Sequence, residues 1–140
     1  MADVLVDAGA LVAFLDADDG EHERCLEALQ RVRDPLATVW PALTEAMHLL
    51  ADTPRGANAL CDMVCDRALK LLPLEGSEMA RIKQLMEKYR DLPMDFADAA
   101  LVRAAERDGL TRIVTFDRHF GVYRLPRRTK FTVLPPSHWK

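Results

Sequence analysis

Five short apolar runs alternate with helical segments along this chain, and that alternation restricts its fold more than any other feature. The runs fall at residues 4–6, 36–40, 69–74, 112–116 and 131–135. Between them, apolar residues recur every three or four positions, which is the spacing of an amphipathic helix. Strands that alternate with helices usually form a parallel sheet covered on both faces. The sequence therefore predicts an α/β protein, a three-layer α/β/α sandwich with a parallel sheet of about five strands.

Proline and glycine mark the limits of the helical segments. The expected helices cover residues 10–15, 21–32, 41–50, 57–69, 75–89 and 95–107. Pro35 and Pro93 end two of them, and residues 53–56 (Thr-Pro-Arg-Gly) are expected to form a break before the fourth. Pro41 suits the first turn of a helix, and Gly109 suits a C-terminal cap.

Size and composition favour one domain over residues 1–140. Of the 140 residues, 49% are apolar and 29% are charged, so the chain supplies a core without a metal or a disulfide. No run of about 18 apolar residues occurs, and no basic segment precedes an apolar one at the start. We therefore expect neither a membrane span nor a signal peptide. The three cysteines form no CxxC pair, which favours a reducing, cytoplasmic protein.

Charge is distributed unevenly along the chain. Residues 1–102 hold 10 Lys and Arg against 19 Asp and Glu, whereas residues 103–140 hold 9 against 3, and the net charge is −3. The basic end either attracts a polyanion or serves solubility alone. Its side chains either clamp an RNA backbone or form a solvated loop. These candidates for RNA binding are Arg118, Arg124, Arg127, Arg128 and Lys130.

Acidic residues stand where an open parallel sheet binds its ligand, beyond the carboxyl ends of the strands. Asp7 directly follows the first apolar run, and Asp117 follows the fourth. Glu45 lies one turn into the third expected helix, and Asp98 lies in the first turn of the helix that begins near Asp95. If the first and fourth strands are neighbours, all four carboxylates converge in one cleft.

Four carboxylates in one cleft repel one another, so some would bind protons unless a cation is present. Mg²⁺ or Mn²⁺ relieves this repulsion, because both are hard cations that prefer oxygen ligands. Such an ion polarises a phosphate and lowers the pKa of a bound water, which indicates hydrolysis of a phosphodiester. Each acid also has a purely structural interpretation, as a helix cap, a turn former or an exposed helix residue.

The segments around these acids resemble the PIN-domain ribonucleases, in particular the bacterial VapC-like toxins. The resemblance rests on VLVDAGALVAFLDADDGEH, WPALTEAMHLL, MDFADAALVRAAERDGLTRIVTFDRHF and a closing FTVLP. It implies a Rossmann-like α/β/α fold with a five-stranded parallel sheet, and RNA cleavage that depends on Mg²⁺ or Mn²⁺. It also implies a homodimer and inhibition by a small antitoxin protein.

The resemblance assigns roles to individual residues by their position. Four acids match the catalytic and metal-binding quartet of the family: Asp7, Glu45, Asp98 and Asp117. The three aspartates of this set would hold the metal directly, and the glutamate would complete the shell or position the attacking water. Asp95 matches an acidic position that some members add, and Thr115 matches a Thr or Ser that orients carboxylates or a water.

Two other functions remain open at this point. A phosphatase of the haloacid-dehalogenase type would carry a DxDxT motif after the first strand, but Ala8, Gly9 and Ala10 follow Asp7. A non-catalytic PIN module would dock RNA or a protein through the same acidic cleft. The complete acidic set argues against such a module without excluding it. We therefore expect a divalent-metal-dependent endoribonuclease, the toxin of a VapBC-like toxin–antitoxin pair.

Overall fold

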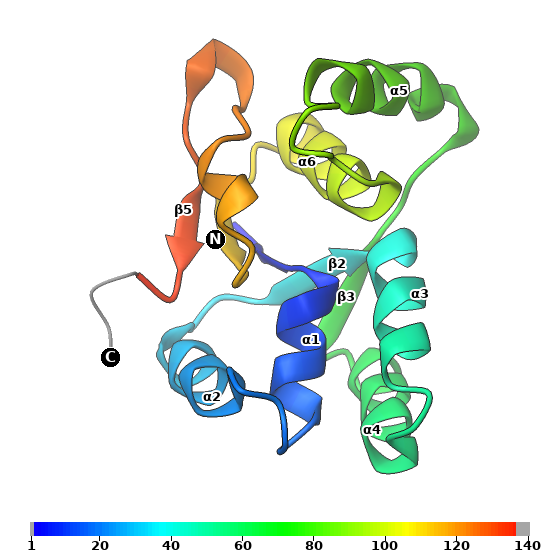
Figure 1. The fold of residues 1–140 in the computed structure, drawn as a ribbon, viewed down its shortest axis with the longest axis vertical. Coiled ribbons are helices and arrows are strands. Elements are labelled where there is room, and N and C mark those ends of the chain that lie inside the picture. The colour runs from blue at the N-terminus through cyan, green and yellow to red at the C-terminus, as the bar shows by residue number, and fades with distance from the viewer. Residues whose placement is uncertain (1, 137–140) are drawn as a thin grey trace.

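A five-stranded parallel sheet forms the centre of the protein (Figure 1), whose computed structural model describes residues 2–136. In spatial order its strands are β3 (Leu69–Leu72), β2 (Leu36–Val39), β1 (Val4–Val6), β4 (Arg112–Val114) and β5 (Thr132–Leu134). Every neighbouring pair runs parallel. The predicted parallel sheet is confirmed, and β1 and β4 are neighbours, as convergence of the acids requires.

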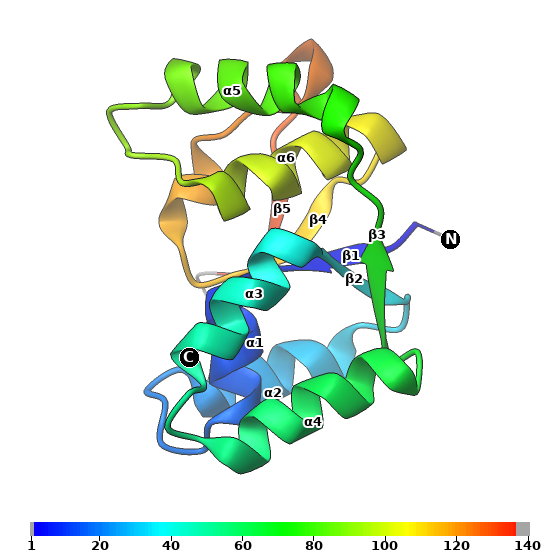
Figure 2. The ribbon, with the colours of Figure 1, turned by 90° about the vertical axis from the view of Figure 1, so that its right-hand side faces the viewer.

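Helices cover both faces of the sheet (Figure 2). They are α1 (Ala8–Leu15), α2 (His22–Arg31), α3 (Trp40–Leu49), α4 (Pro54–Cys65), α5 (Met79–Lys88) and α6 (Phe96–Asp108). Helices α5 and α6 lie on one side of the sheet, and α1, α2 and α4 lie on the other. Helix α3 follows β2 directly and contacts both α1 and α6. Within residues 2–136, no helix has the length and apolar character that a membrane span needs.

The central strand β1 is apolar throughout because both of its faces are covered. Val4, Leu5 and Val6 are at most 1% exposed. Leu5 pairs in register with Ala37 of β2 and with Ile113 of β4. A strand buried on both faces has no polar side, which explains the continuous apolar run in the sequence.

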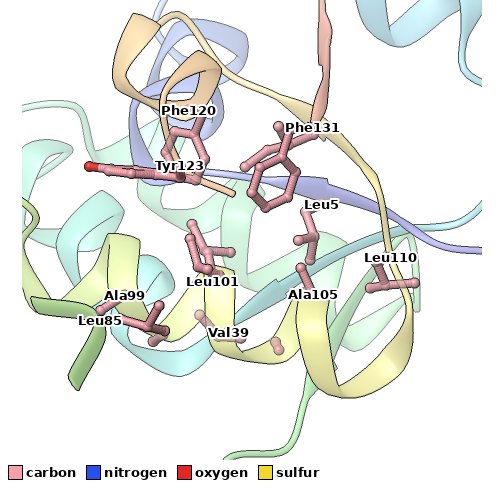
Figure 3. Packing of buried hydrophobic residues seen from close by; sticks show 14 of the residues in the cluster. Leu5, Val39, Leu85, Ala99, Leu101, Ala105, Leu110, Phe120, Tyr123 and Phe131 are labelled. Carbon is pink, nitrogen blue, oxygen red and sulfur yellow. The ribbon is translucent and has the colours of Figure 1, made fainter. Parts of the chain in front are cut away.

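Aromatic residues from the last part of the chain form a cluster that covers α6. Phe120 and Tyr123 are fully buried, and their rings lie 5.0 Å apart in an edge-to-face arrangement. Phe131 packs on Phe120 in the same way at 5.7 Å. In Figure 3 these rings gather beside Leu101 of α6 and Leu5 of β1. Because edge-to-face pairs add to the stability from burial, the cluster anchors the segment that follows β4.

The fourth helix begins and ends earlier than the sequence predicted. We expected a break at residues 53–56 and a helix over 57–69, but α4 starts at Pro54 and Leu69 begins β3. Proline is tolerated in the first turn because the amide hydrogen that it lacks would have no partner in the helix. After the helix, Arg67 adopts a left-handed conformation, with φ at 63°, where the chain turns toward β3.

A glycine inside α4 allows a close approach to α1. A Cβ atom at Gly56 would lie 3.0 Å from the backbone oxygen of Leu15 and 3.1 Å from Cδ2 of Leu50. Because a backbone carbonyl cannot move aside easily, we expect Gly56→Ala to lower the free energy of unfolding by about 1–3 kcal/mol in urea denaturation. Gly76→Ala is the control, since no atom lies within 4 Å of a Cβ there. Unchanged stability of Gly56→Ala would contradict the close packing.

Candidate active site

The carboxyl ends of β1 and β4 place two aspartates at one edge of the sheet. Asp7 follows β1 and is the N-cap of α1, where its Oδ1 accepts a hydrogen bond from the Ala10 amide at 2.8 Å. Asp117 follows β4, and its Oδ1 accepts a hydrogen bond from the His119 amide at 2.9 Å. Each aspartate therefore caps the helix or turn that follows it and also lines the cleft between the two strand ends.

Further acids reach the same cleft from α3 and α6. Asp95 is the N-cap of α6, and its Oδ1 accepts a hydrogen bond from the amide of Asp98 at 2.8 Å. Asp98 itself lies in the first turn of that helix, and half-buried Glu45 projects from α3. The structural interpretation of Asp95 and Asp7 as caps is thus correct, and it does not remove either residue from the cleft.

The cleft has a volume of about 360 Å³ and a strongly acidic lining. Among the residues that the structure describes, none of its lining side chains is basic. Its acidic lining residues are Asp7, Asp19, Glu21, Glu45, Asp95, Asp98 and Asp117. Sequence reasoning missed Asp19 and Glu21 of the loop between α1 and α2. Their only signal was the density of acids in that loop, which a solvated turn explains equally well.

A single hydroxyl connects the two central aspartates. Thr115 is buried, and its Oγ1 donates a hydrogen bond to Oδ2 of Asp7. The same oxygen accepts a hydrogen bond from the backbone amide of Asp117 at 2.9 Å. Thr115 therefore fixes the orientation of one carboxylate and the backbone position of the other.

Burial and mutual repulsion raise the pKa values of three carboxyls in the cleft. Burial, and then the charges of Asp95 and other acids, raise the pKa of Asp98 to about 8. Burial raises the pKa of Asp7 to about 6, although hydrogen bonds from Thr115 and a backbone amide oppose the shift. Burial, together with the charge of Asp95, also raises the pKa of Glu45. The protein alone does not neutralise these charges.

The donor chemistry of the cleft fits a hard divalent cation. Carboxylate oxygens are the ligands that Mg²⁺ and Mn²⁺ prefer, and a cation would relieve the repulsion. Both oxygens of Asp7 already accept hydrogen bonds. Across residues 2–136, no three His, Cys, Asp or Glu side chains are grouped as a ready metal site. The fit therefore rests on the donor set and its uncompensated charge, and not on preformed coordination.

Tyr123 contributes a contact to the cleft that the sequence did not indicate. Its hydroxyl donates a hydrogen bond to Oδ2 of Asp98 at 3.4 Å. Burial, followed by the charge of Asp98, raises the pKa of Tyr123, so the hydroxyl keeps its proton. Tyr123 lies between the turns at Arg118–Gly121 and Pro126–Arg128, and no motif around it in the sequence predicts this contact.

The arginines that we expected to contact RNA fall into two groups. Arg118 lines a hollow that adjoins the acidic cleft, because both are lined by Phe116 and Asp117. Three others line a separate hollow beside α5 and do not line the acidic cleft: Arg124, Arg127 and Arg128.

The acidic cleft lies at the β1/β4 switch point of the five-stranded parallel sheet, which is where open α/β sheets bind their ligands. The profile of the PIN domain matches residues 4–125, and the chain belongs to that family. Over 136 residues it is 29% identical to the ribonuclease VapC26 of Mycobacterium tuberculosis, an alignment that covers 94% of this chain and all of that protein. The predicted family is confirmed.

Two solved structures share the fold. VapC20 of Mycobacterium tuberculosis, described as a toxin that cleaves the sarcin–ricin loop, aligns with a TM-score of 0.79 at 16% identity, over 86% of this chain and 94% of that one. VapBC2 of Rickettsia felis, solved with a DNA fragment from its promoter, aligns with a TM-score of 0.64 at 13% identity, over 94% and 98% of the two chains. At these identities the likeness establishes the fold alone.

Removing the charge at Asp98 should stabilise the metal-free protein. Because the pKa of Asp98 in the folded protein is raised from 3.8 to about 8, its ionisation favours the unfolded chain as the pH rises across that range. We expect Asp98→Asn to raise the Tm in EDTA by about 2–5 °C at alkaline pH. The gain should be smaller at pH values near 5, where the folded wild type keeps its proton.

The matched control for this measurement is Asp91→Asn. Asp91 is an exposed acid shortly before α6 and does not line the cleft. Its replacement should leave the Tm unchanged at both pH values. A lower Tm for Asp98→Asn than for the wild type at alkaline pH would refute the repulsion.

Proposed function

We propose that this protein is a divalent-metal-dependent endoribonuclease that hydrolyses phosphodiester bonds in RNA. The observation that carries the proposal is the cleft at the switch point, with seven acidic side chains and no basic one in its described lining. Asp7 and Asp98 in this cleft have raised pKa values because burial and neighbouring acids disfavour their charged forms, and no cationic side chain opposes either shift. Membership of the PIN family and the similarity to VapC26 supply the class of substrate.

In this proposal the cation is held by carboxylates from three elements of the fold. Asp7, Asp98 and Asp117 would bind it directly, and Glu45 would complete the shell or position the attacking water. When bound there, a divalent cation would polarise a phosphate oxygen and lower the pKa of a bound water. Asp95 adds negative charge at the same place while it caps α6.

The protein's own groups orient these carboxylates before any substrate binds. The Thr115 hydroxyl and the Ala10 amide hold one oxygen each of Asp7. The N-termini of α1 and α6 point their free amides at Asp7 and Asp95, which favours the charged carboxylates. Charged groups that are already oriented need not rearrange when the transition state forms. Such electrostatic preorganisation is usually the largest single contribution to catalysis.

We extend the proposal to a toxin that a small antitoxin protein inhibits. The similarity to the ribonuclease VapC26 and the shared fold with VapBC2 support it. Such a toxin meets its RNA in the cytoplasm, and the three cysteines are compatible with that compartment because Cys25, Cys61 and Cys65 are free thiols.

A homodimer is the second part of the proposal. Trp40, the first residue of α3, is 59% exposed. A groove of about 410 Å³ runs between α3 and α4 and is lined by Trp40, Leu43, Met47 and Val64. Contiguous exposed apolar surface on a small protein marks an interaction site. We assign this groove to a second copy of the chain.

The nuclease proposal is tested by cleavage of labelled RNA with Mn²⁺ and with EDTA. Cleavage should require the metal. Asp117→Asn keeps the shape of the side chain and removes one charge, so the cation is held less tightly. We expect the cleavage rate to fall by about a hundredfold or more, roughly 3 kcal/mol in transition-state stabilisation.

Asp52→Asn is the matched control for Asp117→Asn. Asp52 is exposed and does not line the cleft, so its replacement should leave the cleavage rate unchanged. A folded Asp117→Asn protein that cleaves at the wild-type rate, or metal-independent cleavage, would contradict the nuclease assignment. In that case the non-catalytic binding module becomes the better explanation of the cleft.

The dimer is tested by light scattering at micromolar concentration. We expect the wild type to be a dimer and Trp40→Glu to be a monomer, because a buried charge in an apolar interface is costly. Met79→Glu is the matched control, since Met79 is 50% exposed on α5, away from the groove. A monomeric wild type would refute the dimer and leave the nuclease proposal intact.

A further inference from the structure

A second hollow, lined by two arginines, adjoins the acidic cleft. Its volume is about 480 Å³, and it shares Phe116 and Asp117 with the cleft. Two cationic side chains line it, Arg24 from α2 and Arg118 from the turn after β4. Much of the remaining wall is apolar or small, formed by Gly121, Val133, Pro135 and Pro136. A volume of this size is typical of sites for small organic groups.

The guanidinium of Arg24 is held firmly but keeps an unused donor. Its Nη1 donates to Oε2 of Glu21 at 2.8 Å, and its Cζ lies 5.5 Å from the centre of the Phe116 ring, within the range of a cation–π contact. Its Nε is buried without a hydrogen-bond partner, the one such side-chain nitrogen or oxygen within residues 2–136.

The rest of the Arg24 side chain is accessible to a ligand. The side chain is 36% exposed and lines the hollow, although its Nε is buried and out of reach of an external acceptor. Charge-assisted hydrogen bonds to arginine are the strongest of their kind. Two arginines that line one hollow therefore indicate an anionic ligand.

We propose that this hollow binds the RNA strand next to the scissile bond, with a backbone phosphate at Arg24 and Arg118 and the adjoining nucleoside against Phe116 and the apolar wall. This inference rests on the proposed nuclease function. The reacting phosphate then lies at Asp117, which also borders the hollow, so one strand occupies both sites. Phosphates pair well with arginine, and single-stranded RNA is commonly held by contacts with aromatic side chains.

The hollow supplies an attraction that the acidic cleft lacks. The cleft repels a polyanion, and the chain as a whole carries a net charge of −3. Arg24 and Arg118 offset that repulsion locally, at the RNA phosphate next to the one that lies at the acids. Arg24 is therefore a positioning residue for RNA. Its loss should raise the KM for RNA cleavage much more than it lowers kcat.

Arg24→Met tests the site, because methionine keeps most of the apolar stem and removes the charge. We would measure the Kd of a fluorescent single-stranded RNA by anisotropy in EDTA, where neither metal nor cleavage contributes. We expect the Kd to rise about tenfold. The slope of log Kd against log salt should fall by about 0.7, as expected for one lost phosphate contact to a single strand. Arg24→Lys keeps the charge and should retain the wild-type slope.

Arg31→Met is the matched control on the same helix. Arg31 forms an ion pair with Glu27 and does not line the hollow, so its Kd and slope should stay near the wild-type values. Arg118→Met replaces Arg24→Met if the latter does not fold, with the same expected change in Kd and slope.

Three results would overturn this inference. The first is that the wild type does not bind RNA. The second is that folded Arg24→Met keeps the wild-type Kd and slope. The third is that Arg24→Met and Arg31→Met lose RNA affinity equally. Wild-type RNA binding in Arg24→Met together with weakened binding of an acidic peptide would assign the hollow to a protein partner instead. Failure of the nuclease proposal is a separate result, in which the wild type does not cleave RNA with Mn²⁺ although Arg24→Met changes binding as expected.

Discussion

The parallel pairing of β1 with β4 brings Asp7 and Asp117, the two central aspartates of the cleft, to the same edge of the sheet. Leu5 and Val6 lie in register with Ile113 and Val114, so the residues that follow each strand emerge side by side. The Thr115 hydroxyl then joins the end of β4 to the Asp7 carboxylate. A shift of one residue in this pairing would turn Thr115 away from that carboxylate, because successive side chains of a strand point to opposite faces.

The protein buries carboxylates in two contrasting ways. Glu78 is buried at the start of α5, where a backbone amide of Glu75 and the guanidinium of Arg107 hold its pKa below the usual range. Arg103 also pairs with it at 3.1 Å. Asp7 is buried and Asp98 is half-buried beside other acids instead, and their pKa values are raised. The chain can therefore compensate a buried carboxylate, and the uncompensated cleft is better explained by a ligand than by stability.

The sequence predicted the sheet and most of the acids for a physical reason. Parallel strands buried on both faces are short apolar runs, and the residues that follow them lie at one edge of the sheet. Asp7 and Asp117 could therefore be placed from their positions alone. Helix geometry then oriented Glu45 and Asp98, once α3 and α6 were known to begin at the same edge.

Other features could not be predicted, because they depend on packing between distant segments. Arg24 follows Glu21 by three positions on a helix, an arrangement that a surface ion pair explains fully. Only the fold brings it to the ring of Phe116. The same holds for Gly56, whose first-turn position in α4 is read as a break unless the contact with the end of α1 is known.

Four consecutive residues after β4 serve the two neighbouring sites in turn. The side chain of Thr115 orients Asp7. Phe116 and Asp117 line both the cleft and the hollow, whereas Arg118 lines the hollow and not the cleft. This segment continues into the turn that contains Phe120, whose ring is buried in the aromatic cluster. Packing of that cluster therefore sets the spacing between the groups proposed to hold the cation and those proposed to hold the RNA strand. In a nuclease of this design, binding and chemistry would share one short rigid segment, so the position of the strand relative to the acids is a property of the core.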